Sequence, residues 1–189
     1  MSDRVGRAFE AVPRKDFLPA SQRRYAQQDR ALDIGYGATN SQPTTVRNML
    51  ELLDVEPGHR VLDVGSGSGW TTALLAHLVG PDGEVVAVER VPQLVELGLE
   101  HLGRRYPQAS VHQALADVLG WPDRAPYDRI LVSAAASRRP VELLAQLGPG
   151  GVMVVPILGV MHRLEQGEQP DQVQDEEHGR YSFVPLKGG

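Results

Sequence analysis

After residue 44 the chain alternates between short apolar runs bounded by turn formers and longer segments whose apolar residues recur three and four positions apart. The short runs predict strands near residues 60–64, 84–89, 110–114, 128–133 and 151–157. The longer segments predict helices near residues 44–54, 69–79, 92–105 and 139–147. Because strands and helices alternate, the pattern indicates an α/β fold with a doubly wound, mostly parallel sheet and helices on both faces.

The pattern changes at both ends of this core. A short helix is predicted near residues 4–11, and residues 12–43 are rich in turn formers and hydroxyl groups, which favours a substrate-side segment. After residue 157, apolar runs at 158–164 and 181–186 predict two late strands joined by an acidic loop that we expect to be mobile. With these two, the predicted sheet has seven strands, and an antiparallel strand lies at one edge.

The length of 189 residues fits one domain, which we expect to divide into an N-terminal segment, a cofactor-binding core and a C-terminal pair of strands, residues 1–43, 44–157 and 158–189. No apolar stretch is long enough to span a membrane, and the N-terminus lacks a signal-peptide pattern, so we expect a cytoplasmic protein. The absence of cysteine excludes disulfides and thiolate nucleophiles, and the six histidines show no metal-ligand spacing, so no metal site is predicted.

Charge is unevenly distributed along the chain. The net charge of −5, from 19 basic and 24 acidic residues, disfavours a general nucleic-acid binder. Basic residues nevertheless gather in the first thirty positions, at Arg4, Arg7, Arg14, Lys15, Arg23, Arg24 and Arg30. This segment either attracts an anionic substrate or forms an ordinary solvated surface.

The apolar run at 61–64 leads into a glycine-spaced turn with the pattern D-x-G-x-G-x-G, from Asp63 to Gly69. Dinucleotide sites use the spacing G-x-G-x-x-G, which places a pyrophosphate on the following helix. An acid two residues before the first glycine repels a pyrophosphate but suits the ammonium of a methionine moiety. The spacing therefore favours S-adenosylmethionine, although an ordinary glycine-rich turn gives the same pattern.

Two more acids follow strand ends. Glu89 ends the second predicted strand about twenty residues after the turn, where an acid accepts hydrogen bonds from ribose hydroxyls. Asp117 follows the third predicted strand and is placed to accept from an adenine amino group. Ligands of open parallel sheets bind at the carboxyl ends of strands, so we expect Asp63, Glu89 and Asp117 to share one crevice.

Taken together, several segments resemble the protein-L-isoaspartate O-methyltransferase family across nearly the whole chain. They stand in the family's order: Val12-Pro13-Arg14 with Phe17 and Pro19, Ile34-Gly35-Tyr36-Gly37 with Thr39, Ser41, Gln42 and Pro43, the 63–69 turn, Leu119-Gly120-Trp121-Pro122, Ala134-Ala135-Ala136 and Phe183-Val184-Pro185-Leu186. The stretch around Thr39 and Ser41 is the most specific of these.

The resemblance implies the Rossmann-like fold of class I S-adenosylmethionine-dependent methyltransferases. It also implies methyl transfer to the α-carboxylate of L-isoaspartyl residues in damaged proteins or peptides, with S-adenosylhomocysteine as product, by a monomer that uses neither nucleic acid nor membrane. Ser41 would be the active-site hydroxyl, assisted by Thr39. The implied cofactor contacts are Asp63, Gly65, Ser66, Gly67, Gly69, Glu89, Arg90, Asp117 and Val118.

The chain departs from the family's pattern at several positions, which marks a divergent member. Asn40 stands where an apolar residue is usual, Asp33 where proline is common, and Trp70 where tyrosine is common. Ala116-Asp117-Val118 replaces Gly-Asp-Gly, so added side chains lie beside the adenine edge. Three alternatives stay open on the sequence: a tailoring enzyme for the aspartate of one dedicated peptide, a cofactor-binding protein without catalysis, and an NAD-dependent oxidoreductase.

Overall fold

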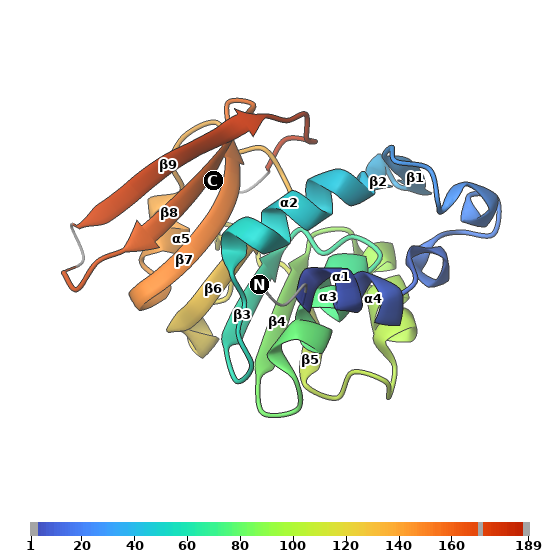
Figure 1. The fold of residues 1–189 in the computed structure, drawn as a ribbon, viewed down its shortest axis with the longest axis horizontal. Coiled ribbons are helices and arrows are strands. Elements are labelled where there is room, and N and C mark those ends of the chain that lie inside the picture. Colours follow the sequence, from blue (N-terminus) through green and yellow to red (C-terminus); the bar gives the residue numbers. More distant parts are fainter. Residues whose placement is uncertain (1–3, 170–171, 187–189) are drawn as a thin grey trace.

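The computed structural model describes residues 4–169 and 172–186, and its centre is a seven-stranded sheet (Figure 1). In spatial order the strands are β5 (Ala109–Gln113), β4 (Glu84–Glu89), β3 (Arg60–Val64), β6 (Tyr127–Val132), β7 (Leu147–Ile157), β8 (Val160–Gln166) and β9 (Val173–Arg180). The first five pair in parallel, and β8 is antiparallel to both of its neighbours. The predicted α/β fold class is therefore confirmed.

Four helices cover one face of the sheet, namely α1 (Arg4–Ala11), α2 (Pro43–Leu53), α3 (Trp70–Val79) and α4 (Pro92–Leu102). Side chains of α3 such as Leu74 and Leu75 are fully buried against this face of the sheet, where they meet Val61 and Val85. α3 is apolar almost all round because α1 covers it from the outside.

The opposite face is covered mainly by irregular chain. Leu62, Val64, Val86 and Val88 pack there against Leu119 and against the short helix α5 (Val141–Leu144). The helix predicted at 139–147 is thus only four residues long, and the strand predicted at 151–157 begins earlier, at Leu147.

The prediction is wrong for one strand at the end of the sheet. Residues 173–180, expected within or beside a mobile acidic loop, form the edge strand β9, whereas the expected strand at 181–186 lies outside the sheet. β9 exposes most of its residues and so lacks apolar alternation, and its charges suit an edge strand. Asp175 in β9 pairs with Arg139 and His162, while Asp171 of the acidic stretch lies outside the described residues.

Residues 184–186 instead lie beside the loop that comes after β6. The Ala135 N–H donates to the Val184 carbonyl at 2.8 Å, and the Leu186 N–H donates to the Ala135 carbonyl at 2.8 Å. The chain end described by the structure therefore lies at the carboxyl edge of the sheet, and the antiparallel strand is β8 rather than the outermost one.

The N-terminal segment adds a small hairpin outside the sheet. After the 3₁₀ turns η1 (Arg14–Phe17) and η2 (Arg23–Tyr25), strands β1 (Leu32–Gly35) and β2 (Ala38–Asn40) pair antiparallel. A third 3₁₀ turn, η3 (Pro122–Arg124), precedes β6. Within the described chain, every helix is too short or too polar to cross a membrane.

We expect Leu74→Ala to lower the free energy of unfolding by about 3–5 kcal/mol, because Leu74 is completely buried between α1 and the sheet. Leu99→Ala is the matched control, since Leu99 on α4 is 51% exposed and should change stability by less than about 0.5 kcal/mol. Urea denaturation followed by circular dichroism measures both. Equal losses in the two variants would contradict this account of the core.

Candidate active site

The strand order changes direction between β3 and β6, so the crossovers leaving these two strands diverge at their carboxyl ends. The turn after β3, residues 65–69, lies beside the loop after β6. The Ser133 N–H donates to the Val64 carbonyl at 2.9 Å, and a side chain added at Gly65 would contact Ser133. Open α/β sheets bind ligands at this position, so the glycine turn stands at the expected site.

The three glycines of the turn adopt backbone angles that side chains disfavour. Gly65, Gly67 and Gly69 have φ values of 81°, 54° and 88°. The turn is close to other chain segments, since a side chain at Gly67 would meet Ile34 of β1 at 3.3 Å. Glycine is thus favoured here by conformation at all three positions, and at Gly67 also by the close approach of Ile34.

Asp63 lies inside β3 and is fully buried. Its Oδ2 accepts hydrogen bonds from the hydroxyls of Thr71 at 2.9 Å and Thr72 at 2.7 Å, whereas Oδ1 has no partner among the described residues. Burial raises the pKa of Asp63 from 3.8 to about 6, an effect that the two hydroxyls oppose and the nearby Glu89 reinforces. An unpartnered carboxylate oxygen in this position is suited to a cationic ligand.

Glu89, at the end of β4, is almost completely buried and holds the turn in place. Its Oε2 accepts from the Gly67 N–H at 2.9 Å, while Oε1 accepts from the N–H groups of Arg90 at 2.7 Å and Val91 at 3.0 Å. A carboxylate offers about four acceptor positions, so these three bonds leave it room for a further donor. Arg90 itself has an exposed side chain.

The remaining predicted contacts lie on or near the same edge with different exposure. Ser66 is buried, and its hydroxyl has no partner within the described chain. Asp117 is exposed, and Val118 beside it is half-buried. Asp117 has a φ of 60°, a left-handed conformation that aspartate tolerates better than most residues. The structure therefore brings Asp63, Ser66 and Glu89 together around the turn and leaves Asp117 at its outer side.

The N-terminal hairpin lies over the glycine turn. Besides the close approach of Ile34 to Gly67, Asn40 Nδ2 donates to the Ser68 hydroxyl at 3.4 Å. Ser41 directly follows β2 and is half-buried, whereas Thr39 in β2 is exposed. The two predicted hydroxyl residues thus stand beside the turn, on the segment that connects the hairpin to α2.

Arg14, which the sequence singled out only as one member of the basic N-terminal cluster and of the Val-Pro-Arg stretch, organises this segment. Its guanidinium is buried and donates to Asn40 Oδ1 at 2.7 Å, to the Asn40 carbonyl at 3.0 Å and to the Ser41 carbonyl at 2.8 Å. Burial lowers the pKa of Arg14 to about 10. No sequence pattern predicts these hydrogen bonds, because the partners are up to 27 residues away in the chain.

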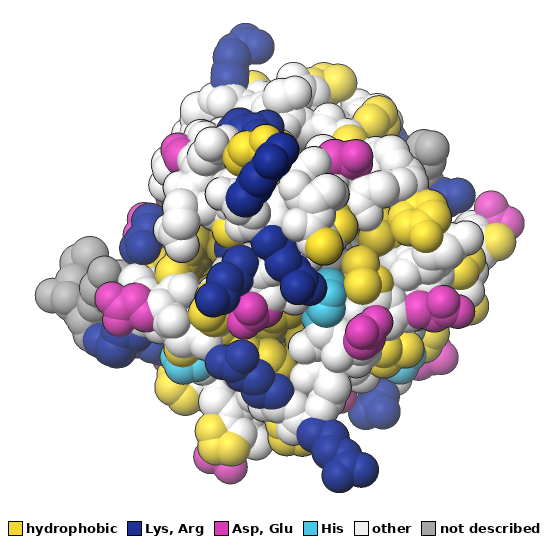
Figure 2. Space-filling view, turned by 90° about the vertical axis from the view of Figure 1, so that its right-hand side faces the viewer, with side chains coloured by type: hydrophobic (Ala, Val, Ile, Leu, Met, Phe, Trp, Pro, Cys, Tyr) yellow, Lys and Arg dark blue, Asp and Glu magenta, His cyan; other side chains and the backbone are white. Residues whose placement is uncertain are grey.

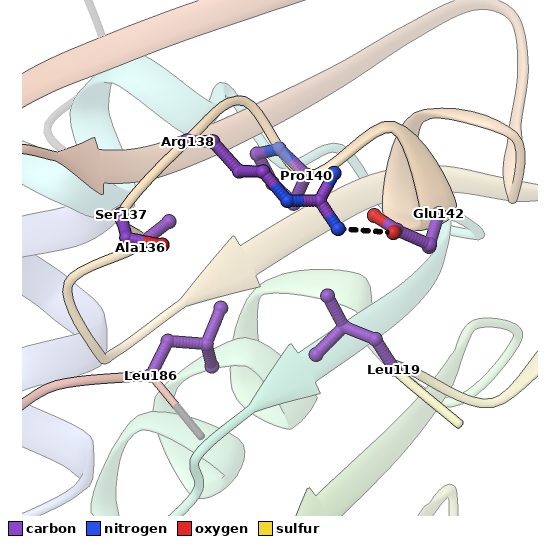
Figure 3. A pocket seen from close by; sticks show the side chains of 7 residues that line it. All are labelled: Leu119, Ala136, Ser137, Arg138, Pro140, Glu142 and Leu186. Carbon is purple, nitrogen blue, oxygen red and sulfur yellow. Dashed lines mark hydrogen bonds and ion pairs between the residues drawn. The ribbon is translucent and has the colours of Figure 1, made fainter. Parts of the chain in front are cut away.

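Two hollows in the described surface lie away from the turn. A cavity of about 10 Å³, enough for one water molecule, lies between Leu119, Leu186 and the loop before α5, where Arg138 pairs with Glu142 (Figure 3). A larger open groove of about 720 Å³ lies at the opposite edge of the sheet, near His77 and Tyr106. The candidate site is instead identified by the topology of the sheet and by the buried polar groups that lie close together at the glycine turn. No group of three or more candidate metal ligands occurs in the described chain.

Comparison with known proteins identifies the family. A family model described as protein-L-isoaspartate(D-aspartate) O-methyltransferase (PCMT) matches residues 1–189. A protein-L-isoaspartate O-methyltransferase of Methanopyrus kandleri is 44% identical over 195 residues, which cover 99% of this chain and 84% of that protein. The chain belongs to the PCMT family. The resemblance found in the sequence is therefore confirmed.

Solved PCMT structures share the fold. A structure from Plasmodium falciparum, whose name carries the same family and a complex with S-adenosyl-L-homocysteine, has a TM-score of 0.87 at 25% identity and covers 100% of this chain and 92% of that one. Another PCMT structure has a TM-score of 0.87 at 27% identity, and the chain spans 62% of its length. The predicted class I, Rossmann-like methyltransferase fold is confirmed for this PCMT.

We expect the stability of this PCMT to fall as the pH rises from about 4 to 6. The raised pKa means that folded Asp63 holds its proton up to a pH of about 6, whereas the unfolded chain releases it near 3.8. The contribution of Asp63 to the free energy of unfolding should therefore decrease by about 2 kcal/mol between pH 4 and 6. Urea denaturation at pH 4, 5, 6 and 7 measures this contribution as the difference between the wild type and Asp63→Asn.

Asp82→Asn is the control, because Asp82 is an exposed turn residue and its substitution should preserve the wild-type slope. If Asp63→Asn and the wild type lose stability equally between pH 4 and 6, the protonated state assigned to Asp63 is wrong.

Proposed function

We propose that this PCMT transfers the methyl group of S-adenosylmethionine to the free α-carboxylate of L-isoaspartyl residues in damaged proteins or peptides. Membership of the family supports this activity, and the complex of the P. falciparum relative with S-adenosyl-L-homocysteine supports the donor. The names of the relatives favour repair of damaged protein over the alternative of one dedicated peptide.

The observation that carries the donor assignment is the pair of unpartnered buried polar atoms, Asp63 Oδ1 and Ser66 Oγ, at the glycine turn. A buried polar atom without a partner is costly, so a ligand that supplies hydrogen-bond donors would relieve both. The methionine ammonium of the donor fits Asp63, and the glycines at 65, 67 and 69 allow the ligand to lie against the backbone. We propose this turn as the methionine side of the donor site.

The ribose side of the donor is proposed at Glu89, with the backbone of Arg90 beside it. Glu89 already fixes Gly67 through a 2.9 Å hydrogen bond, so one side chain would connect the ribose to the methionine end. Asp117 and Val118 are proposed for the adenine. The exposure of Ala116 and Asp117 is compatible with an adenine held at an open edge rather than in a closed slot.

Ser41 is proposed to hold the acceptor carboxylate, with Thr39 nearby on the same segment. The Ser41 hydroxyl makes no hydrogen bond to the described residues, while its main chain is fixed by Arg14 and, through Gln42 and Thr44, by Asp29. This arrangement leaves the hydroxyl available as a donor on a rigid support, which is what orientation of a substrate requires.

The chemistry needs no general base. An α-carboxylate is ionised at neutral pH, so one of its oxygens can attack directly. The bound donor supplies an activated methyl group, whose bond to sulfur breaks as the ester bond forms, leaving the electron pair on sulfur. The task of the chain is to align the carboxylate with the methyl group and to exclude water. The methyl ester then closes to a succinimide.

We also propose a single-domain monomer that acts on protein substrates without nucleic acid. The edge strand β9 supports this state, because the exposed charges of Asp175, Glu176 and Glu177 oppose strand-to-strand association between copies.

The first test is methyl-ester formation from labelled S-adenosylmethionine on three peptides that differ only in L-isoaspartate, L-aspartate or D-aspartate at one position. We expect transfer to the isoaspartyl peptide, and we expect Ser41→Ala to lower kcat/KM about 10²-fold or more while the Kd for S-adenosylhomocysteine stays within twofold. Ser21→Ala, at an exposed position of the same segment, is the control. Equal losses of transfer and donor binding would contradict the role of Ser41.

Glu89→Ala should do the reverse and weaken S-adenosylhomocysteine binding by about 10- to 10²-fold, because a charge-assisted hydrogen bond contributes roughly 1.5–3 kcal/mol. Isothermal titration calorimetry measures the Kd. Glu96→Ala, on the exposed side of α4, is the control. A Kd unchanged by Glu89→Ala would contradict the proposed ribose contact.

A further inference from the structure

Arg14 is a buried cation whose hydrogen-bond partners are all neutral. Besides Asn40 Oδ1, its N–H groups donate to the carbonyls of Ala26 at 3.4 Å, Gln28 at 3.1 Å and Arg30 at 2.8 Å, in addition to those of Asn40 and Ser41. Among the residues that the structure describes, no carboxylate lies within ion-pair distance of this guanidinium. The hydrogen bonds satisfy its donors without neutralising its charge.

Two charged groups of the N-terminal segment lie near Arg14 and act in opposite directions. Asp29 partly offsets the positive charge, and Arg30 adds to it. Asp29 is exposed and is engaged with Gln42 and Thr44, so water screens it, whereas Arg14 is only 6% exposed. Arg14, Asp29 and Arg30 together carry a net positive charge. The charge that water screens least is that of the buried Arg14 guanidinium.

This charge stands directly behind the proposed acceptor site. Arg14 Nη2 lies 2.8 Å from the carbonyl oxygen of Ser41, and the guanidinium also lies over the ring of Trp70, at the start of the helix that follows the glycine turn. Figure 2 shows Lys and Arg side chains gathered on this side of the molecule, so the surface around the buried charge has the same sign. An anion at Ser41 would feel a positive potential that the exposed Asp29 only partly offsets.

We propose that Arg14 is a specificity-determining residue that selects an ionised acceptor by holding behind Ser41 a positive charge that no ion pair neutralises. It acts through its field, because its own donors are already occupied by the chain. This inference rests on the placement of the acceptor carboxylate at Ser41. It also explains the side chain at position 40, which offers an acceptor to Arg14 Nε without adding a negative charge.

The two sides of the crevice then carry opposite buried charges. Asp63 and Glu89 lie on the donor side, where the methyl source is cationic, and Arg14 lies on the acceptor side, where the substrate is anionic. Charges of this kind interact strongly because little water separates them. The arrangement favours one orientation of the two substrates over the reverse.

The decisive variant is Asn40→Asp, which keeps the shape of the side chain and an acceptor for Arg14 Nε but cancels the positive charge. The Ser68 hydroxyl can donate to the new carboxylate, so the packing around position 40 is preserved. With the isoaspartyl peptide as substrate, we expect KM to rise about tenfold. The melting temperature and the Kd for S-adenosylhomocysteine should show no loss.

Asn40→Leu is the matched control, because it removes the acceptor while leaving the charge of Arg14 in place. We expect it to lower the melting temperature and to raise KM less than Asn40→Asp does. If Asn40→Asp leaves KM within twofold of the wild type, or if both variants raise KM in proportion to lost stability, the pair is only structural and the proposal is overturned.

Asp29→Asn changes the electrostatic field at Ser41 from the surface and in the opposite direction, because it removes a negative charge. The buried Arg14 and Asn40 stay unchanged. The asparagine keeps an oxygen for the Thr44 N–H, and its amide nitrogen can donate to the Thr44 hydroxyl, while the hydrogen bond from Gln42 Nε2 is lost. We expect KM to fall about twofold at low ionic strength and the effect to vanish in 0.5 M salt. An unchanged or raised KM would overturn the proposal even where Asn40→Asp fails to fold.

The failure of the proposed function has a different signature. If the wild-type protein methylates no isoaspartyl peptide, the assigned reaction is wrong, and the KM comparison is replaced by calorimetric binding of the same peptide to the S-adenosylhomocysteine complex. A Kd that Asn40→Asp leaves within twofold of the wild type overturns the electrostatic inference, and a rise of about tenfold supports it.

Discussion

β3 is hydrogen-bonded in parallel to β4 on one side and to β6 on the other, and the chain leaves both β3 and β6 at the same edge. Because the two crossovers diverge there, residues 65–69 stand at the position where open α/β sheets bind their ligands. The turn is held by hydrogen bonds from Gly65 and Ser66 to the Val88 carbonyl and from Gly67 to Glu89. The positions of the proposed donor site, the loop after β6 and the N-terminal hairpin all depend on this one pairing.

The site concentrates buried charge at that edge, and the surrounding fold offsets its cost in two ways. Thr71 and Thr72, in the first turn of α3, each donate a hydroxyl to Asp63, although burial still raises its pKa to about 6. Arg14 is instead solvated by backbone carbonyls of residues 26–30 and 40–41. Burial of Asp63 and of Arg14 lowers the stability of the fold. In return, each charged group is held in a fixed position before substrate binds, as electrostatic preorganisation requires.

The N-terminal segment is therefore more than a cover over the glycine turn. α1 packs on α3, and the Trp70 indole N–H donates to the Val12 carbonyl at 3.2 Å, so the segment is anchored to the sheet before it reaches the hairpin. Arg14 and Asp29 then fix residues 40–44 from two directions. These contacts hold a stretch of turn formers in one conformation beside the proposed site.

The sequence by itself determined the elements whose signal is local. The β3 and β4 runs, the α1 helix and the glycine turn were predicted at or within one residue of their positions, because buried parallel strands are continuously apolar and helices repeat every 3.6 residues. The convergence of Asp63 and Glu89 also followed from strand order in a parallel sheet. Only the tertiary structure decided β9, the short α5 and the network of Arg14. An exposed edge strand has no apolar alternation, and α5 is too short to show a helical repeat. The partners of Arg14 are separated from it by 12 to 27 positions, a distance over which sequence pattern carries no pairing information.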